Sequence, residues 1–201
     1  MGITPGHTSP QGVKYRTFDP NAAILRCFQC HSTGPLRLQP GQRIEPFELG
    51  VRCESCHGPG EAHAKSQGAI DNPKRLTSLE VNNLCGACHR KVSEEELTNW
   101  NDPWNVRHQP LYLAQSRCFQ KSRDTMSCFT CHEPHSAVSR SAVEYSKKCE
   151  SCHSGVRHKT AVAGQACTGC HMPVVKLDEN LQFANHWIGV YGRGKPLRPL
   201  R

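Results

Sequence analysis

The chain has 201 residues and a net charge of +8, with only 36% hydrophobic and 6% aromatic residues. A chain this poor in apolar side chains, with 14 Pro and 16 Gly, is not expected to build a large side-chain core. No apolar run approaches the roughly 18 residues of a membrane span, and the first twelve residues lack the apolar region of a signal peptide.

Short helices are predicted at five places in chain order. An Asp-Pro pair caps a helix at residues 20–27, and capping boxes open helices at residues 77–85 and 141–149. A Glu-rich turn of helix is expected at 93–96, and a longer helix at 110–121 after a proline. These helices are short, and the segments between them are long.

Strand signals are weak throughout, and residues 35–50 read as a loop because proline and glycine punctuate them. The fold class expected is therefore mainly α with extensive irregular loops. We expect an N-terminal arm at residues 1–19, one domain at 20–190 and a basic, Pro-rich C-terminal arm at 191–201.

The pattern Cys-x-x-Cys-His occurs six times and uses twelve of the thirteen cysteines. Two thiols three residues apart lie on one side of a helical turn, where they can bond the two vinyl groups of a porphyrin, and the His lies under the ring. Chance would give roughly 0.05 such patterns, so the chain is predicted to carry six covalently bound haem c groups. The cysteines are Cys27, Cys30, Cys53, Cys56, Cys85, Cys88, Cys128, Cys131, Cys149, Cys152, Cys167 and Cys170, and the proximal iron ligands are His31, His57, His89, His132, His153 and His171.

Two alternatives for these cysteines are weaker. Structural zinc takes four ligands, usually from two Cys-x-x-Cys arms, which gives no reason for a His after all six pairs. Cysteines this close in sequence also make poor structural disulfides. The haem interpretation explains the composition too, since short helices wrapped around a closely packed six-haem array need little side-chain core. Each oxidised haem brings two propionates against a ferric core of about +1, so six haems contribute roughly −6 and the +8 charge does not indicate nucleic-acid binding.

Six further histidines equal the number of haems and are the candidate distal ligands: His63, His135, His186, His158, His108 and His7. Two His on opposite sides of one iron need Cα atoms about 12 Å apart, whereas three residues span at most about 11 Å. His135 therefore cannot close over the haem of His132 and must serve another iron. His63 and His158 are also expected to serve a haem other than their own, which brings haems close together.

Two segments resemble the multihaem cytochrome c superfamily, the group of cytochrome c-554, hydroxylamine oxidoreductase and pentahaem nitrite reductase. They are Cys53-Glu-Ser-Cys-His-Gly-Pro-Gly-Glu-Ala-His63 and Cys128-Phe-Thr-Cys-His-Glu-Pro-His135. The block from Gln109 to Phe119, which includes Cys118, and the ending Cys170-His-Met-Pro173 with His186 are similar to cytochrome domains fused to tetratricopeptide repeats. The resemblance implies distal ligation by His63, His135 and His186 and closely stacked haem pairs, whereas related segments often have an aromatic residue at the position of His108.

The function expected is electron transfer through a chain of mostly bis-His haems, without enzymatic activity. The alternatives are a subunit of a polymeric extracellular filament, which would self-associate through haem ligation by His7, and a nitrite- or hydroxylamine-type redox enzyme with one open haem. Haem c is attached outside the cytoplasm, so the chain is expected in the periplasm or outside the cell. Its expected partners are redox proteins or an extracellular electron acceptor, with no nucleic acid and no membrane span. Cys118 is the one cysteine outside the motifs.

Overall fold

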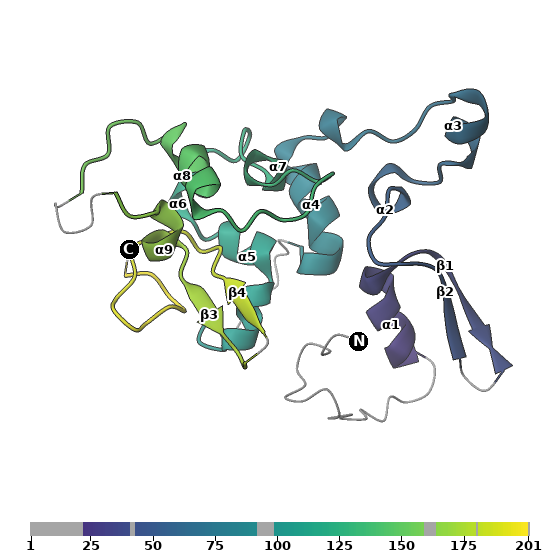
Figure 1. The fold of residues 1–201 in the computed structure, drawn as a ribbon, viewed down its shortest axis with the longest axis horizontal. Helices are drawn as coiled ribbons and strands as arrows, with labels where there is room; N and C mark the ends of the chain where they lie inside the picture. The colour runs from purple at the N-terminus through teal and green to yellow at the C-terminus, as the bar shows by residue number, and fades with distance from the viewer. Residues whose placement is uncertain (1–21, 41–42, 92–98, 159–163, 180, 201) are drawn as a thin grey trace. The chain divides into compact units, whose positions relative to one another are not determined.

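The computed structural model describes residues 22–40, 43–91, 99–158, 164–179 and 181–200 (Figure 1). The chain divides into two compact units, Val13–Thr77 and Ser78–Arg201 together with Met1–Gly12. We call the first the hairpin unit and the second the helical unit. The expected arm at 1–19, the helix at 93–96 and His7 lie outside the described residues, and the three-part domain division stays a prediction.

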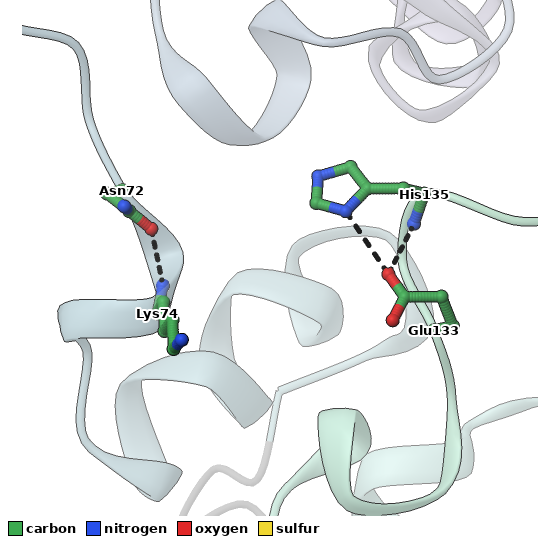
Figure 2. A network of polar contacts seen from close by, with 4 residues as sticks. All are labelled: Asn72, Lys74, Glu133 and His135. Carbon is green, nitrogen blue, oxygen red and sulfur yellow. Dashed lines mark hydrogen bonds and ion pairs between the residues drawn. The ribbon is translucent and has the colours of Figure 1, made fainter.

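The hairpin unit alternates short helices with one β-hairpin. In order, its elements are α1 (Ala22–His31), β1 (Ser32–Gln39), β2 (Arg43–Leu49), α2 (Glu54–His57), α3 (Glu61–Ser66) and a 3-10 turn, η2 (Pro73–Arg75). The side chain of Asn72 caps η2 by accepting a hydrogen bond of 3.0 Å from the backbone N–H of Lys74 (Figure 2). Among the described residues of this unit, the buried ones are Ser32, Thr33 and Pro73.

The hairpin corrects the prediction of a loop at residues 35–50. Strands β1 and β2 pair antiparallel, with Leu36 opposite Pro46 and Gln39 opposite Arg43. The prolines fit because each strand of a two-stranded sheet has a free edge, where a missing N–H costs no hydrogen bond. Gly34, at φ +78°, lies in the irregular step of the register between Thr33 and Leu36.

The helical unit contains six α-helices, one 3-10 helix and two short strands among the residues described after Thr77. They are α4 (Ser78–His89), η3 (Pro103–Arg107), α5 (Gln109–Leu113), α6 (Arg117–Lys121), α7 (Cys128–Cys131), α8 (Ala142–Glu150), α9 (Cys167–His171), β3 (Val174–Lys176) and β4 (Gln182–Ala184). Strands β3 and β4 pair antiparallel (Figure 1). The two predicted helices that lead into Cys85 and Cys149 are present as α4 and α8, and the Ser141 side chain caps α8 by accepting from Glu144 N.

The single helix predicted at 110–121 is instead two, α5 and α6, with a break before Ser116. Ser116 is fully buried, and its hydroxyl donates to the carbonyl of His186 at 3.0 Å and accepts from Ile188 N–H at 2.7 Å. These two bonds to a distant segment need Ser116 in an extended conformation, so tertiary contacts interrupt the helix.

A small side-chain core lies in the helical unit. Val106, Leu111, Tyr112 and Val175 are buried together, and Trp100, Leu177, Phe183, Trp187 and Leu197 pack against them. We call this set the aromatic core. Asn185 is buried beside it and donates to the carbonyls of Pro196 and Leu197, so part of the expected C-terminal arm is bonded to this region.

The observed fold class is thus mixed, with short helices, a hairpin and a small second sheet, rather than strictly mainly α. No helix in the described ranges has the length and apolar character needed to cross a lipid bilayer.

Candidate haem-binding sites

Each of the six Cys-x-x-Cys-His motifs forms a helical turn. Three of the motifs lie in α1, α4 and α9. In the other three, the N–H of the motif His donates to the carbonyl of the first Cys at 2.9 Å: His57 to Cys53, His132 to Cys128, and His153 to Cys149. The two cysteines of each motif are therefore one turn apart on the same side, the arrangement that two thioether bonds to one porphyrin require.

Several proximal histidines are held at ring nitrogen Nδ1 by an oxygen from a distant part of the chain. The bonds are His57 to the Asp71 carbonyl at 2.6 Å, His89 to Gln109 Oε1 at 2.9 Å, and His171 to the Gly189 carbonyl at 2.9 Å. Each oxygen accepts a hydrogen bond, so the proton of the neutral ring lies on Nδ1. The lone pair is then on Nε2, the nitrogen that can bind a metal.

His132 has a weaker anchor of the same kind. Its Nδ1 lies 3.3 Å from the hydroxyl of Tyr145, and that hydroxyl also donates to the Ser139 carbonyl at 3.1 Å. The Tyr145 hydroxyl therefore donates to the Ser139 carbonyl and accepts a hydrogen bond from His132 Nδ1. Sequence reasoning missed both Gln109 and Tyr145, because neither lies near its histidine in sequence.

Three of the predicted distal histidines are anchored at Nδ1 as well. His63 bonds the Gly68 carbonyl at 2.8 Å, His186 bonds the Ala184 carbonyl at 3.0 Å, and His135 bonds Glu133 Oε1 at 3.1 Å (Figure 2). This leaves Nε2 of each ring with the lone pair that an iron ligand needs.

Two pairs of histidine rings lie at the separation of ligands on one metal ion. The ring centres of His132 and His186 are 6.2 Å apart, and those of His158 and His171 are 6.1 Å apart. Two imidazoles on opposite sides of one ion are about 6.3 Å apart, since the metal–nitrogen bond is about 2.0 Å and each nitrogen lies about 1.15 Å from its ring centre. Each pair joins a predicted proximal ligand to a predicted distal ligand of another motif.

His186 is held in place before any metal binds. Ser116 bonds its carbonyl, and the Asn185 side chain accepts from Trp187 N–H at 2.9 Å. Burial lowers the pKa of His186 to about 4, and burial also lowers the pKa of His132. Both rings are therefore neutral at pH 7, the protonation state in which imidazole binds iron.

His108 is bonded at the other ring nitrogen, Nε2, rather than at Nδ1. Its Nε2 accepts from Arg107 Nε at 3.4 Å, and its buried Nδ1 has no hydrogen-bond partner. Burial lowers its pKa to about 4. The ring thus presents a bonded Nε2 rather than an open one, and it joins neither of the two ring pairs.

The remaining predicted ligands are less constrained. His31 and His153 are exposed at the ends of their motifs, and His158 is exposed although its ring lies beside that of His171. His7 and the side chain of Cys27 lie outside the described residues.

Residues 7–58 match the family model of cytochrome c554 and c-prime, a range that contains the first two motifs. The match supports a c-type cytochrome. No curated protein and no solved structure matches the chain significantly. The finer resemblance to cytochrome domains fused to tetratricopeptide repeats stays a prediction.

The donor set of the described residues fits the haem c that a cytochrome of this kind binds. Within the described ranges, no group of three or more His, Cys, Asp or Glu side chains converges as a structural zinc site would require. Pairs of thiols beside a histidine with an available Nε2 are instead the groups that hold a haem by two thioether bonds and an axial ligand.

Cysteines of successive motifs in the helical unit lie close enough to affect one another's pKa. The Cys128 thiol donates to Asn82 Oδ1 at 3.1 Å and lies close enough to Cys85 to lower the pKa of the Cys85 thiol to about 7. Cys149 is hydrogen-bonded to Cys167, and burial is the main cause that raises its pKa to about 11. Cys131 is close enough to Cys152 for that thiol to affect its pKa. The attachment points of motifs three to six thus follow one another in space as they do in sequence.

Proposed function

We propose that this chain is a hexahaem c-type cytochrome that transfers electrons through mostly bis-His haems. The observation that carries the proposal is the pair of ring separations, 6.2 Å for His132 and His186 and 6.1 Å for His158 and His171. Six-coordinate iron has no vacancy for a substrate, so this ligation favours electron transfer over catalysis at the metal.

The roles of the residues follow from their contacts. Bound haem would supply a reversible one-electron iron couple, and the motif cysteines would hold it by thioether bonds. Tyr145, Gln109 and the backbone carbonyls of Gly189 and Ala184 orient the histidines that they anchor. Because the anchors act on Nδ1, they set both the ring angle and the electron donation of Nε2.

The path through the helical unit is proposed to follow motif order. The neighbouring thiols of Cys85 and Cys128, of Cys131 and Cys152, and of Cys149 and Cys167 support it. Each cysteine marks a porphyrin edge, so adjacent cysteines place adjacent edges in contact, and electron hopping needs such short steps.

We further propose that the cytochrome works in the periplasm or outside the cell, because haem c is attached there. Its donor and acceptor are proposed to be redox proteins or an extracellular acceptor. The filament alternative depends on His7, which lies outside the described residues.

Low-temperature EPR of the oxidised holoprotein tests the proposal, together with its mass under denaturing conditions. We expect a mass increment of six haems and low-spin signals from the irons of the two ring pairs. His186→Ala should convert one low-spin haem to high spin without loss of covalent haem. A fully high-spin spectrum, or fewer haem increments than six, would refute the proposal for the irons concerned.

A second candidate, a redox enzyme with one open haem, is supported by His108. If the bond from Arg107 keeps its Nε2 from iron, the distal histidines no longer equal the haems in number. One high-spin signal in the wild-type protein that His108→Ala leaves unchanged would favour this candidate.

A further inference from the structure

The anchors of the histidine rings differ in charge. Neutral oxygens anchor six of them: His57, His63, His89, His132, His171 and His186. His135 is anchored by a carboxylate, that of Glu133. Nothing in the proposed electron-transfer function itself requires this difference. Figure 2 shows the carboxylate of Glu133 bonded to the His135 ring.

A turn holds the carboxylate on the ring. The carbonyl of Glu133 accepts from the Ser136 N–H at 3.2 Å, which closes a four-residue turn with Pro134 in its second position. Proline fixes φ near the value that this position needs. Glu133 Oε1 also accepts from the backbone N–H of His135 at 3.2 Å, so two bonds join the same oxygen to the same residue.

A carboxylate and a neutral oxygen act differently on a histidine that binds iron. The carboxylate draws the Nδ1 proton more strongly, which makes Nε2 a stronger donor and stabilises the ferric state. The phenol that anchors His132 is a neutral acceptor at a longer distance, 3.3 Å. His135 is thus the stronger donor of the two.

As axial ligands, His132 and His135 would serve two different irons, because three residues cannot span both sides of one haem. Those irons would be neighbours, since their ligands are three residues apart. We propose that Glu133 is a positioning residue that gives the haem bound by His135 a lower potential than the neighbouring haem bound by His132 and His186. With haem bound, His135 would hold the iron of lower potential and His132 the iron of higher potential, so an electron would pass from the first to the second. The Nδ1 proton would stay between His135 and Glu133.

The inference rests on the proposed function, in which His135 is an axial ligand. His135→Ala identifies the haem concerned, because its low-spin EPR signal is lost. A redox titration of that signal is then compared between the wild-type holoprotein and Glu133→Gln. Glutamine has the same shape and still accepts a hydrogen bond, so the change removes the charge alone.

In Glu133→Gln we expect that haem to become easier to reduce, with a ferrous-to-ferric ratio about three- to tenfold higher at a fixed potential, where tenfold is about 59 mV for one electron. The lower bound allows for solvent screening, since the Glu133 side chain is 65% exposed. Glu133→Asp, which keeps the charge, should stay closer to wild type. Glu45→Gln is the matched control, because Glu45 bonds Gln39 on the hairpin rather than a histidine. It should leave the signal unchanged.

An unshifted signal in Glu133→Gln, or an equal shift in Glu45→Gln, would overturn the inference while the ligand assignment stands. If Glu133→Gln turns the haem high-spin, the residue holds the ring without tuning it, which also overturns the inference. If His135→Ala leaves every low-spin signal in place, the ligand assignment in the proposed function fails, and the inference fails with it.

Discussion

In the aromatic core, the fully buried Tyr112 ring meets Trp100 and Trp187 edge to face, with ring centres 5.1 and 6.4 Å away. On strand β2, Phe47 and Leu49 are both 66% exposed, and Val51 just after the strand is 63% exposed. Phe47 and Leu49 are two residues apart in the strand, so they lie on the same side of it. The aromatic core buries its apolar side chains against one another, whereas the β-hairpin exposes its apolar side chains.

The difference separates two sources of stability. The helical unit contains side chains that can hold part of it together, whereas the described part of the hairpin unit buries Ser32, Thr33 and Pro73. If the chain binds haem c as proposed, haems are the apolar groups available to the hairpin unit, so we expect this unit to depend on them much more than the aromatic core does.

The largest effect is expected when haem attachment is prevented. In protein made without haem maturation, backbone amides of the aromatic core should exchange with deuterium at least about tenfold more slowly than those of β1 and β2, a difference of about 1.4 kcal/mol. Exchange followed by mass spectrometry of peptides measures this. Equal exchange rates in both regions would show that the aromatic core has no stability of its own.

A pair of leucine substitutions tests the same contrast in the holoprotein. Leu111→Ala removes a side chain that is 4% exposed and should lower the free energy of unfolding by about 2–5 kcal/mol. Leu49→Ala removes one that is 66% exposed and should cost about 0.5 kcal/mol or less. Denaturant unfolding measures both. A loss above about 1 kcal/mol at Leu49 would instead show that a haem packs on the hairpin.

Two glycines inside Cys-x-x-Cys-His motifs, Gly86 and Gly169, allow a second pair of substitutions to be compared. A Cβ on Gly86 would lie 2.8 Å from Lys91 Cα, whereas a Cβ on Gly169 has no atom within 4 Å. Gly86→Ala should therefore destabilise the protein by about 1–3 kcal/mol, and Gly169→Ala should be neutral or stabilise it by up to about 1 kcal/mol. Thermal unfolding of the two holoproteins is the measurement. Equal effects would mean that the loop after α4 moves away without cost.

The fold was predictable from the sequence where local signals decide it. The capping serine and the helical turns of the motifs depend on residues a few positions apart, and α4 and α8 were predicted on that basis. The hairpin was missed because Pro35 and Pro46 argue against strands unless their partners are known. The split of the helix at 110–121 was missed because the partners of Ser116 lie about 70 residues away.

In the candidate site, too, local patterns predict some features, and residues distant in sequence determine the others. The motif spacing alone predicts six attachment sites for haem, and the reach argument predicts that His132 and His135 serve different irons. The anchors Gln109 and Tyr145 are distant in sequence from their histidines, so no local pattern could reveal them. Glu133 is different, because a carboxylate two residues before a histidine across a proline is a local signal that was overlooked.

The smallest effect compares two tyrosines that lose only a hydroxyl. The Tyr112 hydroxyl is buried without a hydrogen-bond partner, whereas that of Tyr145 bonds Ser139 and His132. Tyr145→Phe should cost about 1 kcal/mol, and Tyr112→Phe should be neutral or stabilise the protein by up to about 1 kcal/mol. Thermal unfolding at pH 7 measures both changes.

The pH dependence of stability distinguishes Tyr112→Phe from wild type. Burial raises the pKa of Tyr112 to about 12, from its ordinary value of 10.0, because the charged form would lie in the aromatic core. The neutral ring therefore stabilises the fold fully below pH 10, and that contribution is lost as the pH rises towards 12. Phenylalanine cannot ionise, so Tyr112→Phe should gain stability relative to wild type across this range. If the two proteins lose stability in parallel between pH 10 and 12, the Tyr112 hydroxyl reaches solvent and the aromatic core opens at that point.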